Sequence, residues 1–219
     1  MMNPSMPCPR SLSVVLQVAP EVVPLLQTKL GYAETEWLQR LNDAVQAAID
    51  ALTADAPLPH AYEVALYLTT DAEIRALNRA YRGVDAPTDV LSFGYEAYDD
   101  ARTTLASGLP LPAEGTAPDG FPSQSGENLK EGGQTDVADL PTLGDIVISV
   151  ETAHRQAPLN GHDLLTELLM LALHGTLHLM GYNDSTDAER AAMNRRAASV
   201  LRTLGYPARE EWHSHYEKS

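Results

Sequence analysis

The strongly apolar stretch HDLLTELLMLALHGTLHLMG, from His162 to Gly181, largely decides which fold the chain can adopt. Its apolar residues leave little polar surface, and a helix of this kind is normally buried among other elements. The glycine at its end permits a sharp exit from a helix. We therefore expect this segment to be the central helix of the protein.

Strand-like and helix-like patterns alternate along the rest of the chain. They predict strands at 11–18, 61–70, 89–93 and 145–150, and helices at 33–54, 71–83, around 154, 162–181 and 185–205. Asp71 is placed to cap the second helix, and Thr186 with Glu189 makes the capping-box pattern of the last. This order predicts an α+β fold, with a small mixed β-sheet, helices packed mainly on one face, and the histidine-bearing helix at the centre.

Residues 94–140 differ in composition from everything around them. They hold nine acidic residues against Arg102 and Lys130, and are rich in Gly, Pro and Ser. Such a segment buries too little apolar surface to repay the entropy of ordering it. We expect a disordered leader at 1–10, a single catalytic domain at 11–205 with an acidic disordered insertion loop at 94–140, and a C-terminal tail at 206–219.

The overall composition excludes several classes of protein. The 219 residues, 44% of them hydrophobic, suffice for one core, and no stretch reaches the ~20 apolar residues of a membrane span. The single cysteine, Cys8, cannot form an internal disulfide, so we expect a cytoplasmic protein whose metal sites use His and carboxylates. The formal net charge of −15 disfavours binding of nucleic acid by bulk attraction, and any nucleic-acid contact must use a local patch.

The segment HGTLHLMGYND, residues 174–184, carries the chemistry. His174 and His178 lie one helical turn apart, so their imidazoles point the same way and can share one divalent ion. Gly181 then lets the chain fold back and present Asp184 as a third ligand. Three ligands with a fourth position open is the pattern of catalytic zinc. We expect His174, His178 and Asp184 to bind one Zn²⁺, although another divalent metal would also suit them.

Two other interpretations of the histidine pair remain open. Histidines at this spacing on an apolar helix also occur as satisfied core or capping residues. A zincin-like protease is the second alternative, but zincins carry a glutamate after the first histidine as general base, and Gly175 stands there. The remaining histidines lack metal-ligand spacing, and the pair near the C-terminus is expected to lie in a solvated tail.

The same segment resembles the signature H-G-x-L-H-L-x-G-Y-D-H of the YbeY family of bacterial endoribonucleases. Nine positions follow the pattern, and Asn183-Asp184 replaces the final Asp-His. The segments LNRAYRGVDAPTDVLSF (77–93) and LGDIVIS (143–149) resemble the same family in the same order. The resemblance covers roughly residues 11–204 without the acidic insertion.

The resemblance implies a single-strand-specific, metal-dependent endoribonuclease that matures the 3′ end of small-subunit rRNA and acts in ribosome quality control. Its partners would be rRNA and the small ribosomal subunit, with no membrane, DNA or small-molecule cofactor. Arg82 matches the family arginine and is the expected catalytic residue, because a guanidinium can hold a phosphate bidentately. An arginine that only caps its own helix is the alternative. A non-enzymatic ribosome-assembly factor is the competing function.

Overall fold

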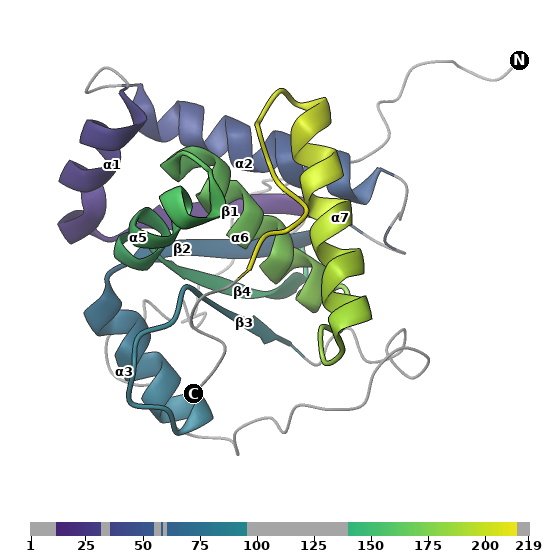
Figure 1. The fold of residues 1–219 in the computed structure, drawn as a ribbon. Helices are drawn as coiled ribbons and strands as arrows, with labels where there is room; N and C mark the ends of the chain where they lie inside the picture. Colours follow the sequence, from purple (N-terminus) through teal and green to yellow (C-terminus); the bar gives the residue numbers. More distant parts are fainter. Residues whose placement is uncertain (1–11, 32–35, 55–57, 59–60, 96–139, 214–219) are drawn as a thin grey trace, which may run out of the picture.

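The computed structural model describes residues 12–31, 36–54, 58, 61–95 and 140–213 (Figure 1). The expected leader at 1–10 and residues 96–139 of the expected insertion lie outside this part of the chain. The strands are β1 (Leu12–Val18), β2 (Tyr62–Thr69), β3 (Val90–Gly94) and β4 (Thr142–Ser149). The helices are α1 (Val23–Leu30) after the 3-10 turn η1 (Pro20–Val22), α2 (Trp37–Thr53), α3 (Asp71–Arg82), α5 (Val150–Asn160), α6 (Leu164–Leu179) and α7 (Asp187–Thr203).

The four strands form one mixed sheet in the order β1-β2-β4-β3. β1, β2 and β4 run parallel, and β3 pairs antiparallel with β4 at the edge. The two crossovers between parallel strands pass through helices, as parallel connections require. The small mixed sheet predicted from the sequence is confirmed.

The helices cover the two faces of the sheet unequally. The main core joins one face of the sheet to α1, α2, α6 and α7 (Figure 1). The opposite face carries α3, whose Ile74 and Leu77 pack against Leu91 of β3 and Val147 of β4. The prediction of helices mainly on one face is therefore confirmed, with α3 as the exception.

Helix α6 lies at the centre of the main core, between the sheet and the outer helices (Figure 1). Asp163 caps its start by accepting a hydrogen bond from the Thr166 amide at 2.7 Å. Almost every residue of α6 is buried, because the helix is apolar on all sides. None of the described helices is both long and apolar enough to cross a membrane.

The start of α3 differs from the prediction. Thr70, and not Asp71, is the N-cap, and its hydroxyl accepts from the Glu73 amide at 3.3 Å. The Asp71 carboxylate is instead bound by the hydroxyls of Ser149 and Thr152 at the start of α5, at 2.6 and 2.7 Å. The local pattern predicted Asp71 as a helix cap, but its carboxylate binds hydroxyls that are distant in the sequence.

The end of the chain also differs from the prediction. We expected a tail from residue 206, but Ala208 and Trp212 belong to the main core, and Trp212 is only 1% exposed. Packed structure therefore continues beyond the end of α7.

Helix α1 was not predicted from the sequence patterns, because its segment contains a proline. This proline lies in the first turn, where a helix tolerates it.

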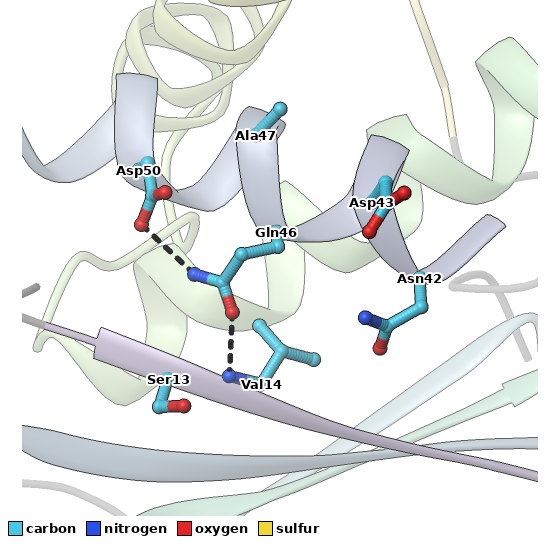
Figure 2. Close-up of a pocket in the computed structure, with 7 residues that line it drawn as sticks. All are labelled: Ser13, Val14, Asn42, Asp43, Gln46, Ala47 and Asp50. Carbon is cyan, nitrogen blue, oxygen red and sulfur yellow. Dashed lines mark hydrogen bonds between the residues drawn. The ribbon is translucent and has the colours of Figure 1, made fainter. Parts of the chain in front are cut away.

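The outer edge of β1 is partly covered by a side chain of α2. Gln46 accepts from the Val14 amide at 2.9 Å and donates to the Leu12 carbonyl at 2.9 Å. Figure 2 shows Gln46 reaching from α2 to β1, with Asp50 bound to the same amide group. The side chain thus pairs two backbone groups that an edge strand would otherwise expose.

Candidate metal centre

The last turns of α6 bring His174 and His178 together. They stand one turn apart, and their Nε2 atoms are 3.0 Å from each other. His174 is 4% exposed, whereas the side chain of His178 is 29% exposed. The pair therefore has one buried member and one that solvent reaches.

The chain folds back after α6 and returns Asp184 to the histidines. Gly181 has a φ of 90°, which favours glycine, and the Tyr182 amide donates to the Leu177 carbonyl at 2.9 Å. Oδ2 of Asp184 lies 3.7 Å from Nε2 of both histidines. The three residues thus form a cluster of possible metal ligands, as the motif predicts.

The separations between the three ligand atoms suit a small divalent ion. Bonds of about 2.0–2.1 Å in a tetrahedral arrangement place neighbouring ligand atoms about 3.3–3.4 Å apart. The observed separations of 3.0, 3.7 and 3.7 Å lie on either side of that value. Two imidazoles and one carboxylate are also ordinary zinc ligands. The residues present therefore fit a metal ion in both distance and chemistry.

The burial of His174 and the hydrogen bond of His178 both favour metal binding. Burial, followed by the nearby His178, lowers the pKa of His174 to about 3, so this imidazole is neutral at physiological pH. Nδ1 of His178 lies 3.1 Å from the Tyr182 carbonyl. A carbonyl only accepts, so Nδ1 carries the proton and donates it. Nε2 of His178 then offers its lone pair to an ion.

Two arginines of α7 hold the loop that carries Asp184. Arg190 donates to the Asp184 carbonyl at 3.3 Å and also pairs with Asp187 at 2.8 Å. Arg196 donates to the Tyr182 hydroxyl at 3.2 Å, and its guanidinium lies 5.6 Å from the centre of that ring. The described contacts of Arg196 therefore support the loop.

The packing at Gly175 leaves no room for a larger residue. A Cβ atom built there would lie 2.8 Å from a methyl group of Ile146 and 3.0 Å from the hydroxyl of Ser92. Both neighbours belong to the sheet beneath α6. A glutamate at this position would therefore meet the sheet before it could reach the metal cluster.

Arg82 lies at the exposed end of α3, on the other side of the sheet from α6. No described contact joins Arg82 to the histidine cluster. Within the described ranges its guanidinium also makes no hydrogen bond or ion pair, unlike Arg75 and Arg79, which pair with Asp85. The structure thus brings the three metal ligands together and leaves Arg82 apart from them.

The other polar residues of the matched motifs have mainly structural contacts. Thr88 and Asp89 are buried, and Asp89 accepts from the Val90 amide at 2.9 Å. Burial raises the pKa of Asp145, against the opposing effect of a hydrogen bond from Tyr95.

Sequence reasoning missed Trp212, whose ring centre lies 5.2 Å from that of His174. No local pattern marks this contact, because 38 positions separate the two residues.

The fold and the site define a class of protein: a mixed α/β domain in which two histidines of the buried central helix and an aspartate of the loop after it form a partly exposed cluster that could bind a metal ion. The family model described as Endoribonuclease YbeY matches residues 29–205. The chain belongs to this family, which confirms the resemblance found in its motifs.

Curated relatives agree with the family assignment. An endoribonuclease YbeY of Moorella thermoacetica is 41% identical over 172 residues, which cover 78% of this chain and 88% of the relative. One of Chloroflexus aurantiacus is 35% identical over 167 residues, covering 76% and 88% of the two chains. The solution structure of TM1509 from Thermotoga maritima aligns over 89% of this chain and 91% of its own, at 18% identity and a TM-score of 0.44.

Proposed function

We propose that this chain is a zinc-dependent endoribonuclease that cleaves single-stranded RNA during maturation of the 3′ end of small-subunit rRNA and in ribosome quality control. The observation that carries the proposal is the convergence of His174, His178 and Asp184 in a member of an endoribonuclease family. Ribosomal RNA and the small subunit are then its partners, and the cytoplasm is its place of action.

Each ligand has a distinct task in this proposal. His174 supplies a neutral, buried nitrogen, and His178 is oriented by its hydrogen bond to the Tyr182 carbonyl. Asp184 adds a negative charge that partly offsets that of a divalent ion. When bound, zinc supplies a Lewis acid that polarises a phosphate oxygen. Two imidazoles favour zinc over the hard ions Mg²⁺ and Ca²⁺, which prefer oxygen ligands.

In this proposal, Arg82 binds a phosphate of the RNA. Its guanidinium is exposed and lacks a partner among the described residues, so it is available for a bidentate contact. An arginine bonded to its own helix end, the alternative considered from sequence, lacks support from any described contact. Because α3 and α6 lie on opposite faces, an RNA strand that touches both must pass around β3, the edge strand.

The protease alternative is weakened by the packing at Gly175. The residue that would be the general base of a zincin is absent, and the contacts with Ile146 and Ser92 leave no space for it. RNA hydrolysis does not depend on a carboxylate at this position, because phosphate charge can be stabilised by a cation and a guanidinium.

The test combines metal analysis with RNA cleavage. Purified wild type, His178→Ala, Arg82→Ala and Arg79→Ala are assayed on single-stranded rRNA fragments, with and without a chelator. We expect wild type to hold one zinc and to lose cleavage on chelation, and His178→Ala to be inactive. Arg82→Ala should keep its zinc and lose on the order of 100-fold in kcat/KM. Arg79→Ala, an exposed neighbour paired with Asp85, is the matched control and should retain activity.

Three outcomes would reject the proposal or part of it. Full cleavage by His178→Ala removes the metal mechanism. Equal activities of Arg82→Ala and Arg79→Ala remove the phosphate role of Arg82. Absence of cleavage by every form, together with bound zinc and association with small subunits, identifies an assembly factor instead.

A further inference from the structure

A fully buried carboxylate, Glu167, lies inside the protein on α6, the helix that carries His174 and His178. Its Oε1 accepts from Gln156 at 2.8 Å, Asn160 at 3.0 Å and the indole N–H of Trp212 at 2.8 Å. Its Oε2 lies 2.7 Å from Nδ1 of His162. Burying a carboxylate is costly unless hydrogen bonds satisfy it, and these four partners do so.

The proton of His162 points at Glu167. Nε2 of His162 accepts from the Arg209 amide at 3.0 Å, so in the neutral ring the proton is on Nδ1. Nδ1 therefore donates to the carboxylate. All four partners of Glu167 are donors, and a carboxylate is the side chain that can accept from all of them.

Trp212 connects this carboxylate to the metal centre. Glu167 and His174 are seven residues apart on α6, which is close to two turns, and so they lie on the same side of the helix. The indole of Trp212 spans that distance: its N–H binds Glu167, and its ring packs against His174 with centres 5.2 Å apart. The ring of His178 also lies against that of His174, with centres 4.6 Å apart.

The segment that carries Trp212 is bound to the domain at further points. Asn194 of α7 donates to the Trp212 carbonyl at 2.7 Å, and Asn160 of α5 donates to the His213 carbonyl at 3.4 Å. These contacts hold the segment 206–213 over α6, although it forms neither a helix nor a strand. The indole is thereby kept in one place relative to His174.

We propose that Glu167 and Trp212 are positioning residues for the ligand His174, and that the segment 206–213 is thereby part of the metal centre. The buried carboxylate holds the indole, and the indole holds the imidazole in the orientation that binds metal and keeps water from its inner face. A ligand fixed in advance loses less entropy on binding an ion. The proposal rests on metal binding by the cluster of His174, His178 and Asp184.

The test measures metal binding directly, so it does not depend on RNA cleavage. Zn²⁺ affinity is measured by chelator competition, and the geometry of the site by the visible spectrum of the Co²⁺ form. The first variant is Trp212→Phe, which keeps an aromatic ring but removes the N–H. The second is Glu167→Gln, which replaces one of the two acceptor oxygens of the carboxylate with an NH2 donor. Trp37→Phe, at the other tryptophan of the chain, is the matched control.

We expect Trp212→Phe and Glu167→Gln to weaken Zn²⁺ binding by about 10- to 100-fold, the usual effect of losing an outer partner of a ligand. Both should change the Co²⁺ spectrum, which a general loss of stability would leave unaltered in the folded fraction. Trp37→Phe should bind Zn²⁺ as wild type does. The tryptophan fluorescence of Trp37→Phe then comes from Trp212 alone and should change as Zn²⁺ saturates the site.

The outcomes separate this inference from the proposed function. If wild type binds no Zn²⁺ or Co²⁺, both are rejected. If wild type binds metal and Trp212→Phe shows the same affinity and spectrum, only the positioning role is rejected, whether or not Glu167→Gln folds. A Trp212 fluorescence that does not respond to saturating Zn²⁺ in Trp37→Phe also contradicts the inference.

Discussion

At the scale of single residues, Asp184 makes this site different from the signature of its family. The signature has histidine at this position. Aspartate binds zinc at a similar distance, but as a negatively charged ligand, whereas histidine binds as a neutral ring. Its Oδ2 stands equally far from both histidines, and Arg190 holds its backbone carbonyl. These contacts hold Asp184 where its carboxylate could bind a metal ion together with the two histidines.

Replacing Asp184 by Ala should lower Zn²⁺ affinity by more than about 10-fold, since loss of even an outer partner has that effect. Asp184→His should retain binding, because it restores the ligand of the family signature. Chelator competition measures both. Asp43→Ala, on α2, serves as a control for the loss of an acidic side chain, and Zn²⁺ affinity of Asp184→Ala equal to that control would exclude Asp184 as a ligand.

At the scale of elements, Asp71 joins the start of α3 to the start of α5. Burial opposes ionisation of Asp71, but hydrogen bonds from Ser149, Thr152 and Arg155 outweigh it, and the pKa of Asp71 is lowered. The Asp71 amide also donates to Glu151 of α5 at 2.7 Å. The two helix starts are thus held together by one carboxylate and one backbone group.

This lowered pKa makes the contribution of Asp71 to stability depend on pH. The carboxylate stabilises the fold above its unfolded pKa of about 3.9, and the contribution is lost as the pH falls through the lower folded value. We expect Asp71→Asn to lose about 1 kcal/mol of unfolding free energy at pH 7, the usual difference between charged and neutral hydrogen bonds. The gap from wild type should shrink below pH about 4. Urea unfolding at pH 7, 5 and 3 checks this, and a gap independent of pH would contradict it.

At the scale of the whole molecule, the ends of β3 and β4 show how the acidic segment joins the domain. Gly94 pairs with Gly144, and the Tyr95 amide donates to the Leu143 carbonyl at 3.3 Å. The end of β3 thus lies beside the start of β4, at a distance that a hairpin turn can span. We propose on this basis that residues 96–139 are an insertion that the fold does not require.

Replacing residues 96–139 by a short Asn-Gly turn should leave the domain folded. A shorter loop costs less closure entropy, so unfolding free energy should rise by up to about 2 kcal/mol. Zn²⁺ affinity should equal that of wild type, because His174, His178 and Asp184 all lie outside this segment. Thermal melts and chelator competition measure the two quantities. A chain that fails to fold, or binds Zn²⁺ more weakly, would show that these residues belong to the domain.

The parts of this protein that its sequence determined are those set by local geometry. The helical repeat places His174 and His178 on one side of α6, Gly181 allows the return to Asp184, and apolar content on all sides buries the helix. Patterns of period two and the capping residues Thr186 and Glu189 likewise predicted most strands and the start of α7. Each of these signals acts over a few residues and needs no distant partner.

Only the tertiary structure decided which distant residues support the site. Trp212 meets Glu167 across 45 positions, and Asp71 is drawn from a helix cap to hydroxyls about 80 positions away. It also placed Arg82 on α3, which packs against the other face of the sheet from α6. Such contacts depend on how strands and helices stack, and the free energy of burying and satisfying polar groups selects them only when the whole core is assembled.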